Sequence, residues 1–83
     1  MTMTSHITAN LTYTIMLNTA RIIARMAVDS ERETNPIRAK ALHAEAKRKR
    51  DHHAHPDTMT PTEIRAFDSA IAQFALQFRE ENQ

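Results

Sequence analysis

The helix signals of this chain converge on one stretch, TPTEIRAFDSAIAQFALQF, which covers residues 60–78. Its first four residues have the capping-box pattern, in which the Thr60 hydroxyl accepts from the Glu63 N–H and the Glu63 carboxylate accepts from the Thr60 N–H. Pro61 occupies the first helical position, where its missing N–H costs nothing and its fixed φ suits a helix. The pattern therefore predicts a helix over about residues 60–79.

Large apolar side chains recur along this stretch at gaps of three and four residues, a spacing that places them on one side of a helix. Burying each of them is worth roughly 1.5–3 kcal/mol. We therefore expect this seam to form the core of the fold or the contact surface of an oligomer. The seam consists of Ile64, Phe67, Ile71, Phe74 and Phe78.

A second helix is predicted over residues 35–52. Asn35 followed by Pro36 is a typical helix start, and the Ala, Lys, Arg and Glu that follow have high helix propensity. The apolar side of this segment is thin, with Ile37 as its largest residue near the start and mainly alanines after it. We expect it to cover its neighbours incompletely, so that apolar surface stays exposed on the first or third helix.

The N-terminal third allows two interpretations. Apolar and polar residues alternate over residues 7–15, as in a half-buried strand, but the chain offers no second strand to pair with it. Apolar residues at gaps of three and four, beginning at Tyr13, instead favour a first helix over about residues 9–29, with Asn10 as its cap. The strand alternative requires pairing between subunits. Residues 1–6 and 80–83 are expected to fray.

The composition limits the fold and the function. The chain has 83 residues, a single-domain length, with no Cys, no Gly and a net charge of +1, so disulfides, thiolate chemistry and glycine-rich phosphate loops are excluded. No apolar run is long enough for a membrane span, and we expect an intracellular, cytoplasmic protein. The predicted fold is all-α: one small antiparallel bundle of about three helices that dimerises.

A basic cluster on the second predicted helix is the most conspicuous polar feature. Clustered Lys and Arg bind phosphates or an acidic protein surface, but cations near a helix C-terminus also complement the helix dipole, and Glu45 is spaced to pair with Lys49, as Lys47 is with Asp51. The candidate partner-binding residues are Arg38, Lys40, Lys47, Arg48, Lys49 and Arg50.

No catalytic or cofactor motif is present in the sequence. His52, His53 and His55 offer a weak alternative as metal ligands, but they lie on one helix end and one loop, without the spacing of a closed zinc site. No Ser, Thr or carboxylate has a recognisable base or orienting partner. We therefore expect a protein that is not an enzyme and that has no metal and no cofactor.

The expected function is that of a small binding protein that inhibits or modulates a larger protein or nucleoprotein machine. Size, the absence of Gly and Cys, and helical amphipathicity are typical of small phage-encoded or plasmid-encoded inhibitors such as anti-CRISPR proteins, which act in the host cytoplasm. Two alternatives remain open: a DNA-binding transcriptional regulator that uses the basic helix on phosphates, and a structural helical oligomer. No membrane partner is expected.

Overall fold

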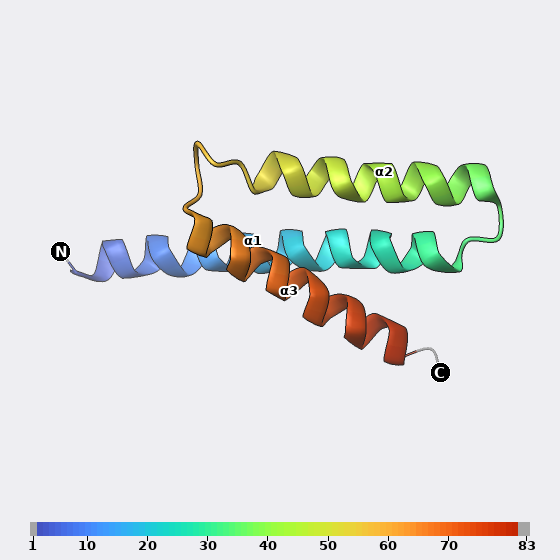
Figure 1. Cartoon of the computed structure of the whole chain (residues 1–83). Helices are drawn as coiled ribbons and strands as arrows, with labels where there is room; N and C mark the ends of the chain where they lie inside the picture. The colour runs from blue at the N-terminus through green and yellow to red at the C-terminus, as the bar shows by residue number, and fades with distance from the viewer. Residues whose placement is uncertain (1, 82–83) are drawn as a thin grey trace.

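The computed structural model describes residues 2–81, and the side chains of residues 12–81. Three helices follow one another, α1 (Thr2–Arg32), α2 (Pro36–His53) and α3 (Pro61–Glu80). Figure 1 shows α1 and α2 as an antiparallel hairpin, with α3 crossing α1 obliquely. The described residues contain no strand. The prediction of an all-helical chain of three packed helices is therefore confirmed.

The first helix is longer than predicted. It begins at Thr2 rather than near residue 9, so Asn10 lies inside the helix and is not its cap. Residues 7–15 are helical, and the strand alternative is not adopted. Neither Gly nor Pro interrupts residues 2–32, so no residue there breaks the helix. Met1, Asn82 and Gln83 belong to the two ends that were predicted to fray, and they lie outside the described residues.

The predicted caps of the second and third helices are confirmed. The Thr60 hydroxyl accepts from the Glu63 N–H at 3.1 Å, and the Glu63 carboxylate accepts from the Thr60 N–H at 2.8 Å. The backbone hydrogen bond from Thr60 holds the pKa of Glu63 below its ordinary value. At the start of α2, the Asn35 side chain accepts from the N–H groups of Ile37 and Arg38. These bonds satisfy donors that the first turn of a helix leaves free.

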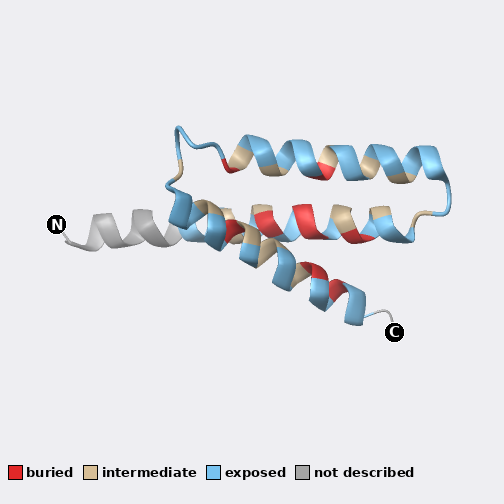
Figure 2. Cartoon of the chain, viewed as in Figure 1, coloured by how far each residue is buried: buried red, intermediate tan, exposed pale blue. Residues whose placement is uncertain are grey.

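The core lies along α1, the helix on which the other two pack. α2 and α3 each pack against α1, whereas their backbones do not pack against each other within the described part of the chain. Figure 2 shows the buried positions concentrated along α1 and on the sides of α2 and α3 that face it. The buried residues form two clusters: Ala20, Ile23, Ala46, Ala54 and Phe67, and then Ala24, Val28, Ala75 and Phe78.

The predicted α3 seam packs against α1. Phe67 and Phe78 are buried, while Ile64, Ile71 and Phe74 are half-buried at the edges of the two clusters. Small residues on α1 allow α3 to approach closely, since alanine adds little bulk between two backbones. α2 contributes only Ala46 to the core, in keeping with its thin apolar side.

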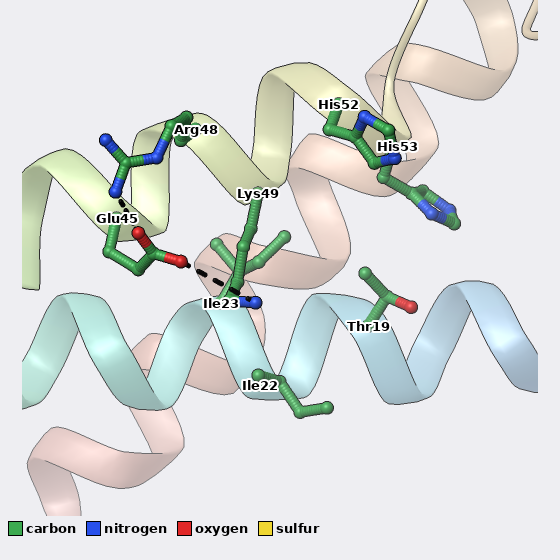
Figure 3. A pocket seen from close by; sticks show the side chains of 8 residues that line it. All are labelled: Thr19, Ile22, Ile23, Glu45, Arg48, Lys49, His52 and His53. Atoms are coloured by element: carbon green, nitrogen blue, oxygen red, sulfur yellow. Dashed lines mark hydrogen bonds and ion pairs between the residues drawn. The ribbon is translucent and has the colours of Figure 1, made fainter.

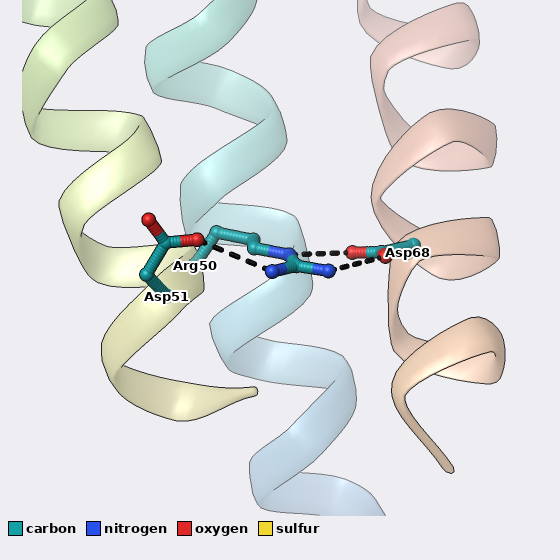
Figure 4. A network of polar contacts seen from close by, with 3 residues as sticks. All are labelled: Arg50, Asp51 and Asp68. Carbon is teal, nitrogen blue, oxygen red and sulfur yellow. Dashed lines mark hydrogen bonds and ion pairs between the residues drawn. The ribbon is translucent and has the colours of Figure 1, made fainter. Parts of the chain in front are cut away.

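Polar side chains connect α3 to the α1–α2 hairpin at two places along α3. Near its start, Asp68 accepts two hydrogen bonds from the Arg50 guanidinium of α2, at 2.6 and 2.9 Å, and Arg50 also pairs with Asp51 (Figure 4). Near its end, Arg79 pairs with Glu31 of α1 at 2.6 Å. The hydrogen bonds from Arg79 hold the pKa of Glu31 below its ordinary value.

The molecule is extended for its size. Its radius of gyration is 14.8 Å, compared with about 12 Å for a compact domain of this length. Its accessible surface is 6359 Å², about 1,300 Å² more than a folded monomer of this mass usually exposes. No helix in the described range combines the length and apolarity needed to cross a bilayer. The fold therefore leaves an unusually large area open to solvent.

Candidate protein-binding face

One side of α1 carries exposed apolar residues. Ile15 and Ile22 are 51% and 55% exposed, and their seven-residue spacing puts them on the same side of the helix, about 10 Å apart along its axis. Neighbouring exposed positions share this side within a sector of about 120°, at 100° per residue. We call this surface the open face. It consists of Thr14, Ile15, Asn18, Arg21, Ile22, Arg25 and, at the end nearest the α1–α2 turn, Asp29.

A groove between α1 and α2 borders the open face. Its volume is about 560 Å³, and Figure 3 shows Lys49 reaching from α2 towards α1 across it. Glu45 accepts a hydrogen bond from Arg48 and pairs with Lys49 at 3.7 Å. The bond from Arg48 is the main reason why the pKa of Glu45 lies below its ordinary value. The lining residues are Thr19, Ile22, Ile23, Glu45, Arg48, Lys49, His52 and His53.

A second groove, of about 480 Å³, also borders the open face. Ile22, Met26 and Phe78 give it an apolar floor, and Arg21 and Arg25 bring two positive charges. The Arg25 guanidinium lies over the Phe78 ring at 3.9 Å from its centroid, a cation–π contact that fixes the position of the charge. No carboxylate is among the described residues that line this groove. Ile22 is common to both grooves.

Positive charge is concentrated around Ile22. The two grooves carry four cations against the single carboxylate of Glu45, so their local charge is 4 − 1 = +3 with His neutral, while the whole chain carries +1. Clefts of one sign attract partners of the opposite sign and raise their association rates. The four cations are Arg21, Arg25, Arg48 and Lys49.

The six predicted basic residues of α2 do not share one face. Arg48 and Lys49 line the groove beside α1, whereas Arg50 is turned towards Asp68 of α3. At 100° per residue, Lys40 and Lys47 lie within about 20° of each other and on the side of α2 away from Lys49. The sequence suggested that Asp51 pairs with Lys47. In the structure Asp51 pairs with Arg50 instead. Arg38 lies near Asp29 and Leu42, at the far end of the hairpin.

Arg21 and Arg25 of α1 are candidate site residues that the sequence analysis missed. They lie three residues from Asn18 and Ile22 respectively, so a helical projection of α1 would have placed them beside these two residues of the open face. The contiguous basic run on α2 drew attention because adjacent charges are conspicuous in a sequence. Adjacent residues of a helix, however, point in different directions.

The three histidines do not form a common site. The His53 ring contacts the Phe67 ring at 4.5 Å between centroids, while His55 accepts a hydrogen bond from the Asp57 N–H. Within residues 2–81, no three His, Cys, Asp or Glu side chains come together in a way that would hold a metal ion. The weak alternative of a metal site at His52, His53 and His55 therefore gains no support.

A third cleft, of about 780 Å³, continues the exposed apolar surface beyond Ile15. It lies where α1 passes the end of α2 and the start of α3, and Tyr13, Met16 and Met59 are among its lining residues. Tyr13 is 59% exposed.

No protein-family model matches the chain, and neither the curated proteins nor the solved structures include a significant match to it.

Proposed function

We propose that this chain is a non-enzymatic binding protein that attaches to a larger protein through the open face of α1 and its two bordering grooves. The observation that supports this most directly is the pair Ile15 and Ile22. Both side chains are about half exposed and lie on the same side of α1, the helix on which the core is built. Large apolar side chains repeated along one side of a helix and flanked by polar groups are typical of helix-binding surfaces.

The surroundings of the open face fit such a role. The cations at the edge of the face correspond to the polar rim that usually encloses an apolar interface core. A binding protein of this size acts by occupying a surface of its target, so inhibition or modulation of that target is the expected effect.

The DNA-binding alternative has less support. Its six candidate cations point to several sides of α2, and Asp68 of α3 already engages Arg50 through two hydrogen bonds. A phosphate backbone is best met by a continuous stripe of free cations. The apolar centre of the open face would gain nothing from phosphate groups.

Affinity capture from a lysate of the source organism tests the proposal. The wild-type chain is compared with an Ile15→Ser/Ile22→Ser variant and with Leu76→Ser, a matched control because Leu76 is 54% exposed on α3. We expect wild type and Leu76→Ser to retain the same partner, with or without nuclease, and the double variant to lose it. Circular dichroism checks that all three are folded. Equal retention by all three proteins, or recovery that disappears with nuclease, would contradict the proposal.

A further inference from the structure

We infer that the partner presents an acidic amphipathic helix, which packs along α1 as a fourth helix beside α2 and α3. This inference rests on the proposed function and specifies the chemistry of the partner. It follows from three features of the open face: the spacing of its apolar residues, the grooves on its two sides, and the sign of the charge around it.

The spacing along the open face matches the seam of two paired helices. Ile15, Asn18 and Ile22 follow at gaps of three and four residues, the alternation of core positions in a coiled coil. A polar Asn within such a seam fixes the register and the partner at some cost in affinity. The two apolar positions, Ile15 and Ile22, are two helical turns apart, so they match apolar residues seven apart on the incoming helix.

The grooves give the incoming side chains a place to pack. Ile22 forms a ridge between grooves of about 560 and 480 Å³. Helices associate by packing the ridge of one into the groove of the other, and a peptide helix bound to a protein uses the same geometry through its apolar side. Side chains on either side of a partner's apolar stripe would enter the two grooves.

The charge decides which kind of helix fits. Arg21 and Arg25 lie on one flank of the stripe, and Arg48 and Lys49 lie across the groove on the other. Glu45 holds the latter two in exposed ion pairs, which are weak enough for partner carboxylates to replace. Asp or Glu residues flanking the partner's apolar stripe would therefore be attracted from both sides.

A second copy of this chain fits the same face poorly. It would bring its own Arg21 and Arg25 to two grooves whose linings already carry a net charge of +3, and like charges across an interface disfavour association. The open face therefore favours an acidic partner over self-association.

Binding of synthetic three-heptad helices, measured by fluorescence anisotropy, tests the inference. The first peptide has Leu at the seam and Glu on both flanks. The second has the same Leu pattern with Lys on the flanks, and the third has the composition of the first with its Leu positions scrambled. Duplex DNA and anionic phosphatidylserine vesicles are measured in parallel. We expect the intact protein to bind the first peptide best, more weakly at high salt.

Two charge-reversal variants make the test specific. Arg21→Glu/Arg25→Glu reverses two cations of the open face, and Lys40→Glu/Lys47→Glu reverses two exposed cations on the far side of α2, with the same change in net charge. We expect the first variant to bind the Glu peptide roughly tenfold more weakly and to gain affinity for the Lys peptide. The second variant should change both affinities by less than about threefold.

Several outcomes would overturn the inference. These are no preference for the Glu peptide over the Lys or scrambled peptides, equal effects of the two variants, stronger binding of DNA or vesicles, and a wild-type dimer that buries the open face. If the peptides fail while captured partner still depends on Ile15 and Ile22, the proposed function stands and only the acidic helix is wrong. If both assays fail, the proposed function is also wrong.

Discussion

At the scale of single residues, Phe67 is the side chain on which the fold depends most. It and Val28 are the largest side chains that are fully buried, and Phe67 packs in the cluster that contains Ile23 of α1 and Ala46 of α2. Phe67→Ala should therefore lower the free energy of unfolding by about 3–5 kcal/mol. Urea titration followed by circular dichroism measures this change.

A second phenylalanine provides the control for this prediction. Phe74 is only half-buried at the edge of both clusters, so Phe74→Ala should cost clearly less than Phe67→Ala, because fewer contacts and a smaller cavity are involved. A loss for Phe74→Ala equal to that for Phe67→Ala would contradict the position of the core described above.

The Arg50–Asp68 pair predicts how stability depends on pH. The hydrogen bonds from Arg50 hold the pKa of Asp68 below its ordinary value of 3.8. A carboxyl group whose pKa is lower in the folded state stabilises the protein above its unfolded pKa, and this contribution is lost as the pH falls through the folded pKa. The pair is partly exposed, so we expect a contribution of at most about 1 kcal/mol.

Thermal unfolding of wild type and Asp68→Asn, compared between about pH 6 and pH 3, measures this contribution. The variant should be less stable near pH 6, and the gap should close towards pH 3. Glu31, Glu45 and Glu63 also have lowered pKa values, and because they titrate in both proteins, their effects cancel in the difference. A gap that stays constant with pH would show that Asp68 acts through packing and not through its charge.

Residue burial was only partly predictable from the sequence. Periodicity correctly placed Phe67 and Phe78 inside, but it also placed Tyr13 on the inner stripe of the first helix, and Tyr13 is exposed. A repeat of three and four residues tells which residues share one side of a helix. It does not tell how far along that side a neighbouring helix extends, and α1 continues beyond the ends of α2 and α3 at its N-terminal end (Figure 1).

At the scale of elements, the start of α3 is fixed by its capping box. Thr60→Ala removes the acceptor for the Glu63 N–H, and loss of such a cap typically costs about 1 kcal/mol. Thr62→Ala is the matched control: Thr62 is also exposed, and its hydroxyl accepts only from the exposed Arg65 side chain. We expect a change below about 0.5 kcal/mol for this variant. Chemical denaturation distinguishes the two, and equal losses would contradict the role given to the cap.

Element boundaries were predictable where a local signal exists. The starts of α2 and α3 were predicted within one residue, because a cap and the proline after it act through neighbouring groups in the sequence. The start of α1 lacks such a signal, and the alternation of Thr with apolar residues over residues 7–15 suggested a different structure. Without a second strand to supply hydrogen bonds, the backbone satisfies its own groups in a helix.

At the scale of the whole molecule, α1 and not α3 is the central helix. The sequence pointed to α3 because its apolar residues are large and lie on one narrow side. A helix with one apolar side needs only one neighbour. α1 has two neighbours, and its Ala20 and Ile23 share a cluster with Ala46 of α2 and Phe67 of α3. Alanines contribute little to an apolar pattern, so this second side was not evident.

The candidate site also belongs to this scale. Its cations come from two helices and its apolar residues from α1, so it exists only once the hairpin has formed. The sequence identified Arg48 and Lys49 as binding residues and expected some uncovered apolar surface. It did not show that these features would meet beside Ile22, because that depends on the packing of α2 along α1.

The polar contacts at two places along α3 have a consequence for the hairpin itself. α2 alone has few large apolar residues with which to fix its longitudinal position on α1, since Ala46 is its one buried residue. A displacement of α2 by one turn would carry Arg50 about 5 Å away from Asp68, while Arg79 still anchors α3 to Glu31. By contacting both helices, α3 therefore favours one longitudinal position of α2 along α1.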